Sequence, residues 1–296
     1  MVWIALAIVY VVWGSTYFAI ALVVQTMPPL LTAGLRHFTA GLVMATWLVV
    51  FQRDALRITR GQIWGAALVG MLLMAGGNGL VVLGERTVPS GLAALIIASV
   101  PLWLVIFRRV TGERVGGDLI AGVTLGLAGV AILVVPSGVS GGVDPIGLAM
   151  ILGAALSWSI GTFISQRIAL PSSIFASAAI QMMSAGAVLL ALGGALGEGQ
   201  HVEIASFSTS SLVALLYLVL FGSLLAYSAY TWLLQNAPVS LVSTYAYVNP
   251  VVAVFLGTVF LREPIAPTTI AGAALIVAAV AFIVTRTGAA RRAAAA

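Results

Sequence analysis

The sequence predicts an all-α membrane protein that crosses a bilayer ten times. Of its 296 residues, 61% are hydrophobic and only 7% are charged, whereas soluble domains carry roughly 25% charged residues. Uncharged apolar runs recur along the chain, and a helix of about 20 such residues spans the hydrocarbon core of a bilayer. The short alternating segments of a membrane β-barrel are absent from the sequence, so the backbone polar groups must be satisfied within helices.

Ten apolar runs are expected to form the membrane helices. The first begins at the N-terminus without a preceding basic region and is longer than the core of a signal peptide, so it is expected to remain as a helix. The segments between the runs are short and leave no room for a soluble catalytic domain, which places the function within the bundle. The runs cover residues 2–24, 31–51, 62–83, 90–107, 118–136, 146–165, 172–195, 209–234, 239–260 and 266–285.

The distribution of charge predicts the orientation. All 13 basic residues are arginines, and the sequence pI is about 10.1. If the N-terminus is cytoplasmic, every arginine except Arg36, Arg86 and Arg262 lies on or near the inner side, as the positive-inside rule requires. Both termini are therefore expected in the cytoplasm. The basic pI is explained by these short loops, so no nucleic-acid partner is expected.

An internal repeat relates the two halves of the chain. A shift of 145 residues aligns Trp13 with Trp158, and a shift of 149 aligns Pro101 with Pro250. Each half contains five predicted helices, an odd number, so the second half must enter the membrane from the opposite side. Such inverted repeats occur in carriers whose two bundles rock around a central site. The predicted repeats cover residues 1–136 and 137–296, the second with a short cytoplasmic C-terminal tail.

Several motifs occur together in order along the chain. They are Trp13-Gly14-Ser15-Thr16-Tyr17, Gly34-Leu35-Arg36-His37-Phe38, Val88-Pro89-Ser90-Gly91-Leu92-Ala93-Ala94-Leu95, Val100-Pro101-Leu102-Trp103 and Gly112-Glu113-Arg114. In this order they resemble the EamA branch of the drug/metabolite transporter superfamily. The resemblance implies a multi-pass protein of the bacterial inner membrane, with ten helices around a central cavity. It also implies export of small metabolites, as in amino-acid exporters of the YddG type, and no cofactor.

The chain departs from one part of that superfamily. Its small multidrug members are built around a glutamate within helix one, where this sequence has Val11, Val12 and Trp13. This difference argues against an antiporter of cationic drugs. A proton-coupled drug exporter and a channel-like facilitator stay open as alternatives to a metabolite carrier.

Polar and aromatic residues within the predicted helices are candidates for lining the cavity. Trp13, Thr16 and Tyr17 share one helix face, and Trp158 and Thr162 lie one turn apart in the second half. Each could equally pack between helices, because hydroxyls and amides in a membrane need hydrogen-bond partners in either case. The candidate substrate-binding residues are Trp13, Thr16, Tyr17, Asn78, Trp103, Trp158, Thr162, Tyr227, Tyr245 and Asn249.

Five further residues are candidates for a gate, a proton link or a hinge. Arg36 and His37 are expected near the outer surface, where an arginine can reach water and a histidine can face it. Glu85 could form an exposed outer pair with Arg86, which would be worth less than about 1 kcal/mol. Pro101 and Pro250 are expected to interrupt their helices near the middle and act as paired hinges.

These features predict a transporter rather than an enzyme. The sequence contains no HExxH or Gly-x-Ser-x-Gly pattern, no ATP-binding motif and no cysteine to hold a metal. No acidic residue lies at a predicted helix midpoint, so facilitated export or exchange is as consistent with the sequence as proton antiport. The expected partners are a small-molecule substrate such as an amino acid, membrane lipid, and at most a second copy of the chain.

Overall fold

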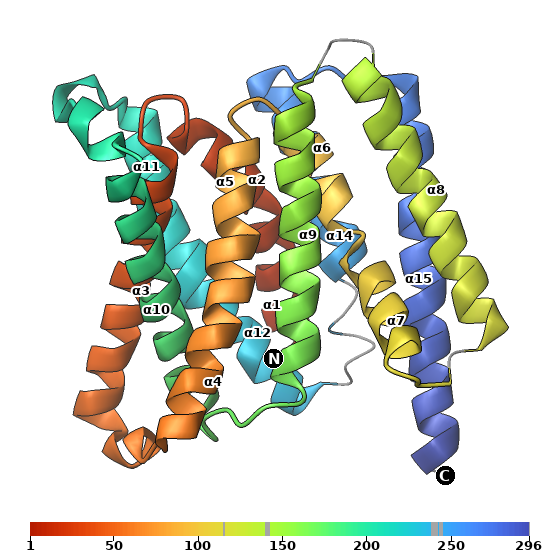
Figure 1. The fold of residues 1–296 in the computed structure, drawn as a ribbon, viewed down its shortest axis with the longest axis horizontal. Helices are drawn as coiled ribbons and strands as arrows, with labels where there is room; N and C mark the ends of the chain where they lie inside the picture. Colours follow the sequence, from red (N-terminus) through yellow and green to blue (C-terminus); the bar gives the residue numbers. More distant parts are fainter. Residues whose placement is uncertain (115, 140–142, 238–241, 243–244, 296) are drawn as a thin grey trace.

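Every described element of the protein is helical, which confirms the predicted all-α class (Figure 1). A computed structural model describes residues 1–114, 116–139, 143–237, 242 and 245–295. The long helices are α3 (Pro29–Phe51), α8 (Gly117–Val139), α9 (Pro145–Ser165), α10 (Ile174–Ala195), α14 (Tyr245–Leu261) and α15 (Pro267–Ala295).

Within the described residues, three long helices contain a π-helical segment in the middle. One consists of α1 (Val2–Ile8), η1 (Val9–Trp13) and α2 (Gly14–Val23). Another consists of α4 (Arg60–Gly70), η3 (Met71–Asn78) and α5 (Gly79–Gly84), and the last of α11 (Thr209–Tyr217), η6 (Leu218–Leu225) and α12 (Ala226–Asn236). A π-helical turn widens the helix and often marks a functional site. All three segments contribute residues to the central cavity described below.

The helix starts follow from local sequence. Thr59 and Gln62 form a capping box at α4, and the Asp144 carboxylate accepts hydrogen bonds from the backbone N–H groups of the first turn of α9. Ser173 and Ser208 cap α10 and α11 in the same way. Such caps satisfy N–H groups that have no partner within the helix, and each is typically worth about 1 kcal/mol.

Within the described residues, seven helices are long and apolar enough to cross a membrane. Three shorter apolar helices, Leu119–Ile132, Val248–Leu261 and Pro267–Ile283, lie where the fifth, ninth and tenth spans are predicted. The prediction of several helices that can cross a membrane is therefore confirmed, whereas the count of ten stays a prediction. The chain begins and ends on the side that is drawn lowest in Figure 1, here called the termini side, and the opposite side is the far side.

The fourth predicted span is broken in two. It forms α6 (Ser90–Ile97) and α7 (Val100–Val110), and Pro101 lies in the first turn of α7. The predicted interruption near Pro101 therefore occurs. Pro250 differs, because α14 continues through it. Residues 239–241, 243 and 244, which would complete the predicted ninth span before Tyr245, lie outside the described part of the chain.

Glycines allow the closest helix contacts. A Cβ added at Gly34 would lie 2.7 Å from the Leu190 backbone nitrogen, and one at Gly41 would lie 2.8 Å from that of Met183. The helices α3 and α10 therefore cross backbone to backbone, as small residues permit in membranes. Gly122 and Gly126 of α8 also lie in close contacts, since side chains of α15 and α7 fill the space beside them.

Alanine at Gly186 is expected to destabilise the protein. A Cβ there would lie 2.5 Å from the Phe38 backbone nitrogen, so the α3–α10 crossing must shift at a cost of about 1–3 kcal/mol. Gly194 lies on the same helix with no heavy atom within 4 Å of its added Cβ. Gly194→Ala is the matched control and should be neutral or stabilising. Thermal unfolding of the purified variants in detergent measures both, and equal melting temperatures would contradict the packing described.

Candidate functional site: a central cavity

A cavity of about 690 Å³ lies between the helices of the two halves of the chain. Its size falls within the range of small-molecule sites, about 300–1,000 Å³. Its wall is formed by α3, α6, α7, α9, α10 and α14, together with the three helices that contain η1, η3 and η6. The cavity is therefore a property of the whole bundle.

Four aromatic rings form one wall, here called the aromatic cluster: Trp13, Tyr227, Tyr230 and Tyr245. The Trp13 ring centroid lies 4.9 Å from that of Tyr230 and 5.4 Å from that of Tyr245. The Trp13 indole N–H donates a hydrogen bond to the Gly222 carbonyl oxygen at 3.2 Å. Gly222 lies in η6, where a π-helical turn can leave carbonyls available to side chains. The ring of Trp13 is thus fixed in its place.

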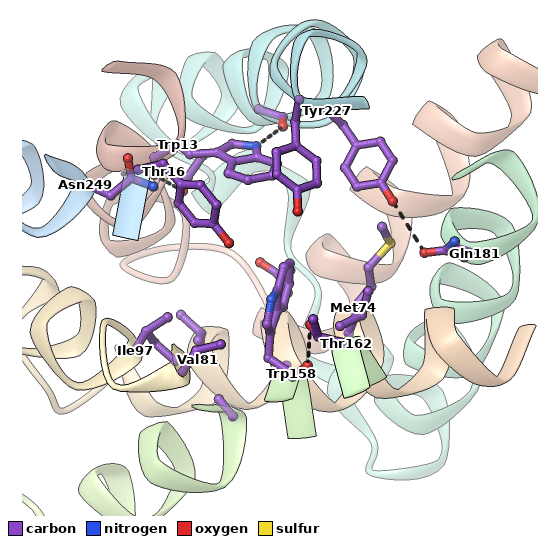
Figure 2. Close-up of a pocket in the computed structure, with 18 of the residues that line it drawn as sticks. Trp13, Thr16, Met74, Val81, Ile97, Trp158, Thr162, Gln181, Tyr227 and Asn249 are labelled. Carbon is purple, nitrogen blue, oxygen red and sulfur yellow. Dashed lines mark hydrogen bonds between the residues drawn. The ribbon is translucent and has the colours of Figure 1, made fainter. Parts of the chain in front are cut away.

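Trp158 forms the opposite wall (Figure 2). A Cβ added at Gly77 would lie 2.9 Å from the Trp158 ring, so the ring can approach η3 this closely only because residue 77 is glycine. Thr162 donates to the Trp158 carbonyl oxygen at 2.9 Å, which satisfies its hydroxyl within α9. Trp158 and Trp13 therefore contribute rings from the two halves, as the repeat predicts for a central site.

Other polar groups in the wall have no partner among the described residues. The Asn78 amide and the hydroxyls of Tyr17, Tyr230 and Tyr245 line the cavity, and no hydrogen bond to another described residue satisfies them. Asn249 differs. With its amide nitrogen facing the backbone, it donates to the carbonyl oxygens of Tyr10 at 3.2 Å and Tyr245 at 3.3 Å. Unpaired polar groups are costly away from water, so this cavity is suited to a polar solute.

The cavity reaches the surface on the termini side. Gln166, Leu170 and Pro171, in the connection from α9 to α10, line it, and Gln166 is exposed. Gln62 at the start of α4 donates to the Leu170 carbonyl oxygen at 3.2 Å and holds one edge of this mouth.

On the far side the cavity is closed. Apolar side chains fill the space beyond it, and each is at most 8% exposed: Val23, Met27, Leu30, Ala33, Val82, Val88 and Leu92. These residues are here called the far-side seal. They belong to α2, α3, the α5–α6 region and the turns that join them. The structure therefore shows one accessible end and one closed end.

Two glutamates from the second half of the chain bind the helix N-termini next to the far-side seal. Glu263 accepts hydrogen bonds from the backbone nitrogens of Ser90 at 2.7 Å and Gly91 at 3.0 Å, the first turn of α6. Glu198 accepts from those of Leu30 at 3.2 Å and Leu31 at 2.9 Å, in the first turn of α3. A carboxylate at a helix N-terminus satisfies free N–H groups and interacts favourably with the helix dipole.

One cluster of charges lies on the termini side. Glu113 forms ion pairs with Arg108 and Arg167, each with a nitrogen–oxygen distance of 2.6 Å. The hydrogen bond from Arg108 is the main reason that the pKa of Glu113 lies below its usual value, and Arg167 lowers it further. These side chains are 37–39% exposed, so water and salt screen both pairs and they contribute little to stability. Among the described residues, no group of acidic, histidine or cysteine side chains could hold a metal ion.

Most of the candidate binding residues meet in this cavity. It is lined by Trp13, Thr16, Tyr17, Asn78, Trp158, Thr162, Tyr227, Tyr245 and Asn249, and by the candidate hinges Pro101 and Pro250. Trp103 does not line it, and its indole N–H is buried without a described hydrogen-bond partner. Tyr230, Gln181 and Ser223 also line the cavity and were missed by sequence reasoning. The i, i+3 spacing of Tyr227 and Tyr230 could have indicated the first of them.

The expectation that Arg36 and His37 lie near the outer surface is wrong. They do not reach the surface, because they are only 6% and 2% exposed and both line the cavity. The face of α3 that carries these two residues packs against η6 and does not face water or lipid. The sequence could place the pair near one end of a helix, but its depth depends on which face the neighbouring helices cover.

The expectation that Glu85 forms an exposed pair with Arg86 is also wrong. Its carboxylate is 6% exposed and forms no ion pair with Arg86, which is exposed. Neither carboxylate oxygen has a hydrogen-bond partner among the residues that the structure describes. Burial raises the pKa of Glu85 well above its usual value, and the charge of Glu263 raises it further. Glu85 does not line the cavity and belongs to the far-side region.

The chain is similar to membrane transporters. A profile described as "EamA-like transporter family" matches residues 1–135 and 145–285. The "Uncharacterized inner membrane transporter YedA" of Escherichia coli K12 is 41% identical over 257 residues, covering 86% of this chain and 81% of that protein. The "Uncharacterized transporter YvbV" of Bacillus subtilis is 26% identical, covering 98% and 93%.

Two further similarities bear on function and fold. A "Probable amino-acid metabolite efflux pump" of Escherichia coli K12 is 27% identical and covers 91% of this chain and 90% of that protein. One solved crystal structure matches with a TM-score of 0.64 and 21% identity, covering 94% of each chain. At that identity, the structural match shows the shared fold alone.

Proposed function

Because this chain belongs to the EamA-like transporter family and is an inner-membrane transporter, we propose that it exports small metabolites, specifically amino acids, by alternating access. The observation that carries this proposal is the central cavity, which is accessible from the termini side and closed at the far side. A carrier that exposes its site to one side at a time requires such a state. The name of the efflux pump relative is consistent with an amino-acid substrate.

The wall of the cavity supports this substrate class. Aromatic rings can contact an apolar side chain or, through their faces, an ammonium group. The unpaired amide of Asn78 and the tyrosine hydroxyls can bond a polar backbone. The described lining contains no acidic side chain, which gives no support to a carrier of cationic drugs.

The proposal includes the two inverted five-helix repeats, ten membrane helices and cytoplasmic termini. Corresponding helices of the two halves pack on each other: α3 on α10, α6 on α14 and α8 on α15. The π-helical segments η3 and η6 are both 8 residues long and begin at Met71 and Leu218, close to the spacing of the sequence repeat. These features support a pseudo-twofold arrangement. With cytoplasmic termini, the observed cavity faces inward.

We include Pro101 and Pro250 as hinges in this proposal. Both line the cavity, and Pro101 follows the break between α6 and α7. A proline has no N–H to donate, so it frees a carbonyl one turn earlier and allows bending there. Movement of α7 relative to α6 would change the inner cavity while α6 stays attached to Glu263 at the far side.

Counterflow in liposomes tests the proposed function. Purified protein is reconstituted with a high internal concentration of one unlabelled neutral amino acid, alanine, leucine, phenylalanine or threonine, and a trace of the labelled compound outside. A carrier exchanges the two, so at least one compound should show saturable uptake that requires the internal substrate. Uptake should persist when a proton ionophore is added, because the described cavity lining contains no carboxylate to couple the proton gradient.

Two results would count against this function. Uptake that rises linearly with concentration and needs no internal substrate would indicate a channel-like facilitator. Absence of flux for every compound, in protein that remains folded, would remove amino acids as the substrate class. Empty liposomes and liposomes with heat-denatured protein are the controls.

A further inference from the structure

Arg36 lies deep in the bundle with its charged group at the cavity. It is 6% exposed, and its Nε donates a hydrogen bond to the Ser223 hydroxyl oxygen at 3.0 Å. A Cβ added at Gly222 would lie 3.2 Å from the Arg36 Nη2 atom and 3.2 Å from the Thr16 methyl carbon. The guanidinium group therefore lies between η6 and α2, on the far-side half of the cavity.

No described acidic residue compensates this charge. The ion pairs of the described chain join Arg57 to Asp54 and both Arg108 and Arg167 to Glu113. Ser223 is the sole described hydrogen-bond partner of the Arg36 side chain, so both Nη groups are left for other contacts. Arginine remains charged under all ordinary conditions, and a charge that is removed from water without a partner is strongly unfavourable.

The neighbouring histidine also lacks a partner. His37 is 2% exposed and lines the cavity, and neither of its ring nitrogens has a hydrogen-bond partner within the described part of the chain. Neutral imidazole always has one N–H to donate. Arg36 and His37 thus place several unused donors at one place in a cavity whose described lining contains no carboxylate. This arrangement is complementary to a group that accepts hydrogen bonds and carries negative charge.

We propose that Arg36 binds the carboxylate of the transported solute, a step that rests on the proposed function. The guanidinium group matches a carboxylate in a two-point geometry, and Ser223 orients it by holding Nε. The rest of the solute faces the aromatic cluster, where Trp13 lies beside the same Gly222. The carboxylate is therefore the required group of the substrate. An α-ammonium group is secondary, since only ring faces and neutral polar groups are available for it.

Matched analogues test the proposal on the unchanged protein. The amino acid with the largest counterflow is compared with its amide, which lacks the carboxylate, and with its deaminated acid, which lacks the ammonium group. For leucine these are leucinamide and 4-methylpentanoate. The deaminated acid should compete with labelled leucine, and the amide should compete at least about tenfold more weakly, as expected for a lost charge-assisted bond. Equal competition by acid and amide would overturn the proposal.

Variants test the residue itself. Arg36→Gln should weaken binding of the amino acid about 10- to 100-fold while changing binding of the amide little, and Arg36→Lys should fall between it and the parent. Ser223→Ala should weaken binding of the acid and leave binding of the amide unchanged. Arg86→Gln removes an exposed arginine as a control. An unchanged ratio of acid to amide affinity in Arg36→Gln would overturn the proposal. Uptake that requires chloride and does not distinguish the acid from the amide would also overturn it, because Arg36 would then bind a free anion instead of the carboxylate of the solute.

A binding measurement separates this proposal from the proposed function. The melting temperature of the purified protein is followed with 4-methylpentanoate and with leucinamide, which requires no transport. Stabilisation by the acid in the parent, but not in Arg36→Gln, would support the carboxylate site even if counterflow were absent. Counterflow of amino acids with no difference between acid and amide in either assay would leave the proposed function standing and remove the role of Arg36.

Discussion

Trp158→Ala is expected to reduce the counterflow of substrate, measured at a concentration below saturation, strongly while leaving the folded yield nearly unchanged. The Trp158 ring forms one wall of the cavity and lies against the glycine backbone of η3. Its removal leaves the solute without a ring on this side. A loss of about 1–2 kcal/mol in ring contacts corresponds to a roughly five- to thirtyfold weaker site.

The comparison with a second tryptophan makes this result interpretable. Trp64 is 73% exposed, does not line the cavity, and lies on α4 facing away from the bundle. Trp64→Ala removes the same side chain and should leave flux unchanged. If folded yield and flux fell together in Trp158→Ala, or if its flux equalled that of the parent, Trp158 would be a packing residue and the aromatic wall would have no role in binding.

Glu263→Gln is expected to shift the protein toward a state that is open at the far side. The carboxylate holds the first turn of α6 through two backbone N–H groups. Arg262 adopts a φ of +55°, a strained conformation for a residue with a side chain, and this turn ends α14 next to Glu263. The neutral amide loses the charge-assisted part of both bonds and the interaction with the helix dipole, about 1–3 kcal/mol in total.

Single cysteines can report this shift, because the chain contains none of its own. Ala33 is 4% exposed in the far-side seal, whereas Leu170 lines the mouth on the termini side. In Glu263→Gln, a cysteine at Ala33 should react faster with an impermeant thiol reagent added from the far side. Glu203→Gln, an exposed acid in the same half, is the control. Unchanged labelling of Ala33→Cys in Glu263→Gln would show that this glutamate does not hold the seal.

The sequence could predict the helices and the aromatic residues of the site for clear physical reasons. Uncharged apolar runs have no stable alternative to a helix in a bilayer, so their positions follow from composition. Trp13 and Trp158 were identified because the repeat relates them, and the structure brings both to one cavity. Local spacing is sufficient for such residues, since a helix fixes which side chains share a face.

Depth and contacts between distant helices could not be predicted from local pattern. Arg36 near a helix end can reach water or turn inward, and the choice depends on α3 packing against η6, more than 180 residues later. The same holds for Glu85, whose burial depends on the far-side region around Glu263. The π-helical segments have no distinct sequence signal, and Trp103 belongs to one of the sequence motifs yet does not line the cavity.

The most direct test of alternating access is to label both ends of the same carrier with and without substrate. Ala33→Cys and Leu170→Cys are each exposed to impermeant reagent from the far side and from the termini side. We expect Leu170→Cys to react from the termini side in the resting protein, and exchange of substrate to raise the reactivity of Ala33→Cys while lowering that of Leu170→Cys. Both positions reacting fully at the same time, from opposite sides, would show a continuous pore and contradict a carrier that opens one end at a time.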